Sequence, residues 1–471
     1  SGSGDILGTL TINSGRGTSR QDFTVTDTQG TATTADDGVV SRGYSFYDGG
    51  TTTVTIHASD INISRTLTVN AQGPVAISIG SEQSDGSSEL FMEGLVVNVA
   101  GTCRVHTEEV DSEGDHVITT VQNIIGFAPV EVDLFSSNRG RIHIGEGGLD
   151  IEAAGLLDVN VNAGSSSGRL VIEAPVRLAA TDATITEDVT DTYSSTQAGS
   201  PYIPGMFFAG TPGMDSITFA PCTFGTSGCV GGTASMTIPA TPETDARFTE
   251  SSSHIRTRGV GSEVEGNFSA GSSIDFYSDI TASGGDVAIG IDGGSSADIT
   301  IGGPVRITST GVDVTTDFAH EFSTGYFDGY TATGPTTRDG YNFYSGSIVE
   351  NGGAAGLSIS GQELEVRGAI TVTGVDEAWA VLDASGSGEG GIFVHDSDAE
   401  VGYDISVVAT GGVFTANETQ GELAGDSVET RTGSIRVRGG TASLDISDNN
   451  SGDIFAGDIT VRSQLYSSLN L

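Results

Sequence analysis

The chain contains no lysine. All 19 of its basic residues are arginines, set against 62 acidic residues, and the formal net charge is −43. Without lysine the chain cannot form a Schiff base or a P-loop phosphate site. Nucleic acids and anionic lipid headgroups require cationic contacts, so we expect no nucleic-acid partner. A net negative charge of this size is expected to keep a long β-protein soluble through self-repulsion.

Long hydrophobic runs are also missing. No segment approaches ~18 consecutive apolar residues, so no membrane insertion is expected. No window sustains the i, i+3, i+4, i+7 spacing of apolar residues that predicts an amphipathic helix. Glycine occurs 69 times, and Thr, Ser and Asp are frequent between short Val- and Ile-rich runs. This composition is typical of short strands and tight turns.

Cysteine is scarce, with three residues in the chain. Cys222 and Cys229 enclose a short Gly-containing segment and are a candidate disulfide, provided that their Cα atoms approach within ~7 Å. Cys103 is left over. Their spacing does not match a zinc site. The candidate pair favours an oxidising, extracellular compartment.

The chain does contain an internal sequence repeat, and we call the repeated segment the phrase. "IEAPVRLAATDATITED" at 172–188 aligns without a gap with "IGGPVRITSTGVDVTTD" at 301–317. Pro175, Val176 and Arg177 recur as Pro304, Val305 and Arg306, 129 residues later. Such self-similarity predicts an architecture of repeats rather than one globular core.

Shorter relatives of the phrase share a pattern of strand, small corner residue and second strand. They lie at 69–80, 172–181, 276–284, 301–311, 366–374 and 455–463. Alternating apolar residues give each strand one buried face, and coils of ~20–30 residues would make about 15–20 coils. We therefore predict an all-β parallel β-helix, one elongated solenoid over 1–471. Tandem β-sandwich domains are the alternative, although their regular period is not visible.

Four stretches interrupt the strand rhythm and are predicted as lateral loop insertions. They lie at about 33–52, 104–120, 187–216 and 315–347. Two similar segments within them, "RGYSFYDGG" and "DGYNFYSGS", concentrate aromatic residues, which are enriched where proteins bind partners. The candidate interaction loops comprise Tyr44, Phe46, Tyr47, Tyr341, Phe343 and Tyr344. Rings folded back onto the body are the competing interpretation.

Two further candidates lie near the C-terminal end. "DNNSGD" resembles part of a calcium loop, and Asp448, Asn450 and Asp453 are its candidate ligands, but no glutamate stands at the twelfth position. Calcium is the only cofactor that the sequence suggests. The last strand lacks a polar cap, and its apolar residues are predicted to mediate assembly. These residues are Ile459, Val461, Leu465, Leu469 and Leu471.

No catalytic constellation stands out. The chain lacks lysine, and no Gly-x-Ser-x-Gly elbow lies between a strand and a helix. Many carboxylates are present, but no sequence feature singles out an acid–base pair. We therefore predict that the protein is not an enzyme, with a polysaccharide-degrading β-helix as the rival class.

Several phrases, among them "GSIRVRGGTASLDI" and "ADITIGGPVRITSTG", resemble filamentous-haemagglutinin-type exoproteins and the β-strand-repeat surface proteins of Gram-negative bacteria. The resemblance implies a parallel β-helix exported to the bacterial cell surface, acting as an adhesin or fibre. The N-P-N-G and N-x-x-G signatures of two-partner secretion are missing, so no export route follows. Because the chain begins with Ser1, we expect either a processed protein or a segment of a longer one.

The sequence thus predicts an extracellular structural protein, a subunit or segment of a bacterial surface fibre or adhesin. Its partners would be further copies of itself, joined head to tail through the ends of the solenoid and the side loops. The alternative is a non-assembling adhesin that binds surface glycans through the aromatic loops.

Overall fold

The computed structural model describes most of the chain as β-structure. The described residues are 3–6, 10–13, 17–27, 38–82, 87–99, 103–113, 116–137, 139–195, 246–331, 334–384, 391–396, 401–424, 427–448 and 453–470. Within them the single helical element is a 3₁₀ turn, Gly294–Ser296. Three sheets carry the structure, one of 18 strands and two of ten strands each. The all-β class is confirmed.

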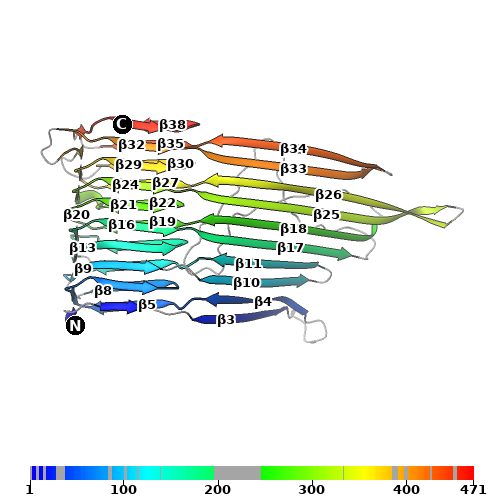
Figure 1. Cartoon of the computed structure of the whole chain (residues 1–471), viewed down its shortest axis with the longest axis horizontal. Coiled ribbons are helices and arrows are strands. Elements are labelled where there is room, and N and C mark those ends of the chain that lie inside the picture. Colours follow the sequence, from blue (N-terminus) through cyan, green and yellow to red (C-terminus); the bar gives the residue numbers. More distant parts are fainter. Residues whose placement is uncertain are drawn as a thin grey trace.

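Two of the three sheets are parallel, and they contain three ladders of stacked strands. The chain visits the ladders in the order first, second, third and then returns to the first, one strand further along the stack (Figure 1). We call one such passage a round, and the described chain makes ten of them, because the third ladder has ten strands. The N- and C-terminal ends lie at opposite ends of the stack (Figure 1).

Each ladder takes one strand from each round. The first ladder contains β1 (Ser3–Ile6), β6 (Asp60–Ile63), β9 (Glu89–Val99), β13 (Arg141–Ala154), β15 (Arg169–Ile172), β20 (Ser273–Phe276), β23 (Asp298–Ile301), β28 (Glu363–Val366), β31 (Ile392–Val394) and β36 (Ile454–Phe455). The second contains β2 (Leu10–Asn13), β7 (Leu67–Ala71), the later halves of β9 and β13, β16 (Val176–Thr181), β21 (Ile280–Gly284), β24 (Val305–Ser309), β29 (Ile370–Gly374), β32 (Ile405–Ala409) and β37 (Ile459–Arg462). The third contains β5 (Thr52–Ala58), β8 (Val75–Ser81), β12 (Val130–Ser136), β14 (Leu156–Asn162), β19 (Glu263–Ser269), β22 (Asp286–Asp292), β27 (Ala354–Ser360), β30 (Glu377–Asp383), β35 (Thr441–Ser447) and β38 (Tyr466–Asn470).

Strict alternation of apolar and polar residues builds the core. In β12, for example, every second side chain is buried. Because the ladders are parallel and in register, equivalent side chains stack about 4.8 Å apart. One core row runs through the first ladder and is almost inaccessible to solvent; it comprises Ile61, Leu90, Ile142, Leu170, Ile274, Ile299, Leu364 and Ile392. The parallel sheets curl into a half-barrel around this core.

The third sheet is antiparallel and is built from hairpins that leave the stack between the second and third ladders. We call these hairpins the arms, and they extend along the longest axis of the molecule (Figure 1). They are β3 (Thr18–Asp27) with β4 (Gly38–Asp48), β10 (Arg104–Glu113) with β11 (His116–Ile125), β17 (Ala183–Ser195) with β18 (Ala246–Gly261), β25 (Val312–Thr331) with β26 (Gly334–Gly352), and β33 (Gly412–Ala424) with β34 (Ser427–Gly439). Successive arms also pair with one another, so the described arms form one ten-stranded sheet.

The arms occur in alternate rounds, the odd-numbered ones. The distance between neighbouring strands explains why the arms occur only in alternate rounds. A hairpin contributes two strands, which occupy about 9.6 Å of a sheet, and two rounds rise by the same distance. An arm in every round would bring twice as many strands as one sheet can hold at this height. The structural repeat is therefore two rounds.

The repeated phrase lies where a two-round repeat requires. Its first copy runs from Ile172, the last residue of β15, through β16 into β17. Its second copy runs from Ile301, the last residue of β23, through β24 into β25. Val176 and Val305 both align with Ile280 in the round between them. Five of the six predicted phrases lie at the corner between the first and second ladders, whereas 69–80 lies at the next corner, between β7 and β8. The expected 15–20 coils are too many, because the arms take up much of the chain.

The described residues of the four predicted insertions lie mainly on strands of the arms, which form the antiparallel sheet. Residues 28–37 and 196–245 fall outside the described residues. The fifth arm, β33 with β34, has no counterpart among the predicted insertions. It carries neither the Tyr-rich segments of the first and fourth predicted insertions nor the acidic run of the second.

Candidate functional site

One member of the predicted aromatic cluster connects neighbouring arms. The Tyr44 hydroxyl lies 2.9 Å from His106 Nε2 on the adjacent strand β10, and the two ring centroids are 5.2 Å apart. Arg20 of β3 lies over the Tyr44 ring, 4.3 Å from its centroid. Asn123 of β11 contacts the other ring nitrogen of His106. Four adjacent strands are thereby linked on one face of the arm sheet.

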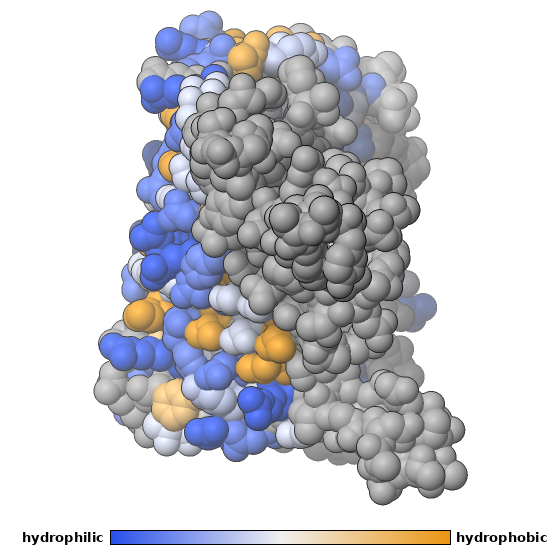
Figure 2. Space-filling view, turned by 90° about the vertical axis from the view of Figure 1, so that its right-hand side faces the viewer, coloured by the Kyte–Doolittle hydropathy of each residue, from blue (hydrophilic) through white to orange (hydrophobic). Residues whose placement is uncertain are grey.

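The two predicted aromatic segments do not form one cluster. Tyr44, Phe46 and Tyr47 lie on β4, whereas Tyr341, Phe343 and Tyr344 lie on β26. Five strands separate β4 from β26 in the arm sheet, which places them about 29 Å apart. Tyr44 and Phe46 are half-buried. Seen from the side on which the arms end, the described surface is mainly hydrophilic, with separate hydrophobic spots (Figure 2).

The calcium candidates lie at the end of the ninth round. Asp448 follows β35 and Asp453 precedes β36, while Asn450 falls outside the described residues. Among the described residues, no group of three or more His, Cys, Asp or Glu side chains is arranged to hold a metal ion. A calcium site here stays a prediction.

The candidate disulfide, Cys222 with Cys229, falls outside the described residues. Cys103 is buried at the base of the second arm, and its thiol donates a hydrogen bond to the carbonyl oxygen of Gln72 (2.5 Å). It packs with Ala128 and Ala154 in a small satellite core.

The predicted assembly residues belong to the tenth round, on β37, at the following corner and on β38. Leu469 continues the core row of Leu444 but is 48% exposed, because no described strand lies on it. Leu465 is also exposed, whereas Ile459 and Val461 are partly buried against the core. Leu471 falls outside the described residues.

The largest concentration of perturbed carboxyl groups lies at the junction between the arms and the body. A cavity of about 430 Å³ opens there, which we call the junction cavity. Its arm side is largely apolar and its body side is acidic. It is lined by Phe127, Gly155, Ala183, Ile185, Thr257, Gly259, Val260, Gly261, Ser262, Glu263, Asp286, Val312, Val314, Glu350, Gly352, Gly353, Ala354, Asp376 and Glu377.

Stacking brings the carboxyl groups together. Glu263 and Asp286 begin the third-ladder strands of consecutive rounds and are aligned partners, so two acidic side chains lie one strand apart. Burial, followed by repulsion from Asp286, raises the pKa of Glu263 to about 7. Glu350 comes from β26, and burial, followed by repulsion from Asp376, raises its pKa to about 7. Like charges in register and partial burial both disfavour ionisation.

Backbone amides hold two of these acids in place. The amide of Ala354 donates to Asp286 Oδ1 (2.7 Å), and the amide of Gly353 donates to Asp376 Oδ1 (2.7 Å). Burial nevertheless raises the pKa of Asp286, and repulsion from Asp376 adds to this rise. Carboxyl groups with a pKa near 7 exchange protons at neutral pH and can serve as general acids or bases. Here they lie on both sides of the junction, Glu263 on the body strand β19 and Glu350 on the arm strand β26.

Sequence reasoning missed this cluster, because its members lie far apart in the chain, from Glu263 to Asp376. A signal was present in the form of acidic residues at the start of third-ladder strands, as in "SEVE", "GDVA" and "DEAW". Recognising it requires the register of the rounds, which the sequence did not supply.

Comparison with protein families, characterised proteins and solved structures gives no match to this chain. The resemblance to filamentous-haemagglutinin-type and β-strand-repeat proteins therefore stays a prediction. Within the described residues, no helix has the length and apolar character needed to cross a membrane.

Proposed function

We propose that the protein is an extracellular structural protein, a unit of a bacterial surface fibre or adhesin, and that its body is a parallel β-helix. The observation that carries this proposal is the common period of its sheets. Over two rounds each parallel ladder gains two strands, and the arm sheet also gains two strands. The parallel ladders and the arm sheet therefore grow along the stacking direction at the same rate. Such an arrangement can be extended without altering any contact within it. This supports a structural role over a catalytic one.

Association would proceed by stacking one copy on another, with a second copy of this chain as the partner. The described residues contain ten rounds, which is a whole number of two-round repeats. A first round laid on β36, β37 and β38 would place β3 of the second copy beside β34. Because β3 runs outward and β34 returns, they would pair antiparallel, as β4 and β10 do. The stacking would therefore extend the body and the arm sheet at the same time.

The exposed residues of the tenth round fit this contact. They are Ile454, Phe455, Leu465, Tyr466 and Leu469. At the other end of the stack, Ile6, Leu10, Ile12 and Ile56 pack against the core yet stay partly exposed. Burial of apolar surface is worth roughly 25 cal/mol per Å², so covering both faces favours association.

The test uses two substitutions that differ by one residue in position. Leu469→Asp introduces a charge on the core row, whereas Ser468→Asp introduces the same charge on the outer face of β38. Negative-stain electron microscopy of the whole chain should show fibres for the parent and for Ser468→Asp, and single particles for Leu469→Asp. Deletion of 463–471 should likewise abolish fibres. Fibres from Leu469→Asp, or isolated particles from the parent, would refute this mode of assembly.

A further inference from the structure

A groove of about 470 Å³ runs along the outer corner between the first and second ladders, far from the arms. It spans the sixth to the ninth round. Its lining includes Asp275, Tyr277, Thr300, Gly302, Arg367 and Tyr403. Cavities of this size can hold small ligands, and this one presents both polar groups and aromatic rings.

The backbone stack creates the hollow. The amide of Tyr277 donates to the carbonyl of Ile172, and the amides of Gly302 and Arg367 repeat this bond in the next two rounds. Tyr277, Gly302 and Arg367 are thus consecutive steps of one row, and Gly302 leaves the middle step without a side chain. Tyr277 and Arg367 then stand about 10 Å apart, two strand spacings.

Gly302 cannot easily be replaced. A Cβ atom at this position would lie 2.7 Å from the carbonyl oxygen of Tyr277, a contact with backbone that cannot move aside. The floor of the groove is therefore kept open by the close approach of successive rounds.

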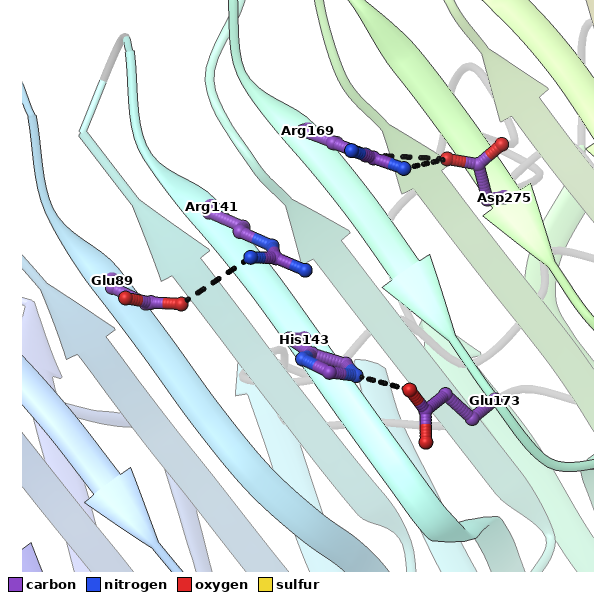
Figure 3. Close-up of polar contacts among 6 residues, drawn as sticks. All are labelled: Glu89, Arg141, His143, Arg169, Glu173 and Asp275. Atoms are coloured by element: carbon purple, nitrogen blue, oxygen red, sulfur yellow. Dashed lines mark hydrogen bonds and ion pairs between the residues drawn. The ribbon is translucent and has the colours of Figure 1, made fainter.

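The charges of the groove are balanced. Arg367 donates from Nε and Nη2 to the two oxygens of Glu365, at 3.0 and 3.3 Å. Arg169 donates to Asp275 Oδ2 from Nε and Nη2, at 3.3 and 3.0 Å (Figure 3). Asp275 on the wall and Glu365 beside Arg367 each have an arginine partner, so neither an anion nor a cation finds an uncompensated opposite charge there. The remaining N–H groups of Arg367 and the hydroxyl of Thr300 can still form hydrogen bonds.

Two tyrosines border this polar floor. Tyr277 is 61% exposed and Tyr403 is 39% exposed, both unusual for large side chains in a well-packed β-structure. Tyrosine combines an apolar ring with a polar end and suits ligands that present apolar C–H faces and hydroxyl groups together. Sugars have this chemistry. We propose that the groove binds a neutral oligosaccharide lying along the stack, with Tyr277 and Tyr403 against its rings and Arg367 donating to its hydroxyl groups.

The experiment is calorimetric titration of the whole chain. The neutral probes are cellohexaose, xylohexaose, mannohexaose and hexa-N-acetylchitohexaose, and trigalacturonic acid is the acidic probe. At least one neutral probe should bind, and more tightly than the acidic probe. Tyr277→Ala should weaken binding at least tenfold, whereas Tyr277→Phe and Tyr277→Trp should retain it, because they keep an aromatic face. Far-UV circular dichroism and the melting temperature should be unchanged in all three variants, since the side chain is largely exposed.

Three results would overturn the proposal. They are the absence of binding by every neutral probe, preference for the acidic probe, and unchanged affinity in Tyr277→Ala. A loss of affinity in Tyr44→Ala with retention in Tyr277→Ala would assign binding to the arms instead. Binding by the groove is a property of one copy, so it does not depend on the proposed stacking. Failure of one proposal leaves the other standing.

Discussion

At the scale of single residues, Glu263 and Glu350 tie stability to pH. Their ordinary pKa of 4.5 rises to about 7 in the folded protein, so the folded state holds protons that the unfolded state has released. Stability should therefore fall as pH rises from about 4.5 to about 7, and stay low above that range. Full burial would make such a shift worth ~3 kcal/mol, but both groups are partly exposed, so we expect about 1 kcal/mol each.

Glu263→Gln and Glu350→Gln should each raise the free energy of unfolding at pH 8 by about this amount and change little at pH 4.5. Urea denaturation at both pH values measures the difference. Glu152→Gln removes one negative charge from an exposed position of β13 and is the control for net charge. Equal gains from all three variants at pH 8 would show that overall repulsion, and not the junction, is responsible.

The single tryptophan offers a second test at this scale. Gly356 is aligned with Trp379 on the next strand, and a Cβ atom at Gly356 would lie 2.2 Å from the Trp379 ring. Gly356→Ala should push the indole away from the sheet, shift its emission to longer wavelength and lower stability by about 1–3 kcal/mol. Gly290→Ala is the matched control, because its Cβ atom would meet only the end of the Asn267 side chain. An unchanged emission spectrum in Gly356→Ala would contradict this packing.

At the scale of elements, the two-round repeat predicts which deletions the fold tolerates. Deleting 363–391 removes the eighth round and stacks two arm-bearing rounds directly on each other. Four arm strands then compete for a height of about 9.6 Å, so β26 and β33 should lose their pairing. Deleting 298–391 removes two rounds and one arm, which leaves β18 beside β33 in antiparallel orientation.

Hydrogen exchange of the arm amides distinguishes these outcomes. The larger deletion should keep protection in β18 and β33, although it removes more residues. The smaller deletion should lose protection in β26 and β33. The reverse order would mean that the arms do not depend on the phase of the stack.

At the scale of the whole molecule, the charge of −43 opposes association. Raising the salt concentration shortens the Debye length from about 10 Å at 0.1 M to about 3 Å at 1 M, so end-to-end association should strengthen by roughly tenfold. Light scattering across this range measures the effect. Sodium chloride and calcium chloride should be compared at equal ionic strength. A larger effect of calcium would indicate specific binding, and an absence of any salt effect would show that charge does not limit assembly.

The sequence predicted the stacked strands of the body but few of the contacts on its surface. Stacked strands were predicted from the alternation of apolar and polar residues in segments such as 305–309. The recurrence of Val176 as Val305 supported them, because a repeated core position needs a repeated side chain. The pairing of Tyr44 with His106 was not predictable, since cross-strand partners depend on the register between arms. The fifth arm was not predictable either. Its presence follows from the occurrence of arms in alternate rounds, whereas its own composition does not indicate it.

By itself, the sequence determined the β-class, the acidic lysine-free surface and the equivalence of 172–188 with 301–317, since these follow from composition and local pattern. Only the tertiary structure decided what lies side by side. It placed arms in alternate rounds because a hairpin and two rounds have the same height. It also brought Glu263 next to Asp286 and set Tyr277 two steps from Arg367, because parallel stacking makes neighbours of residues that are distant in the chain.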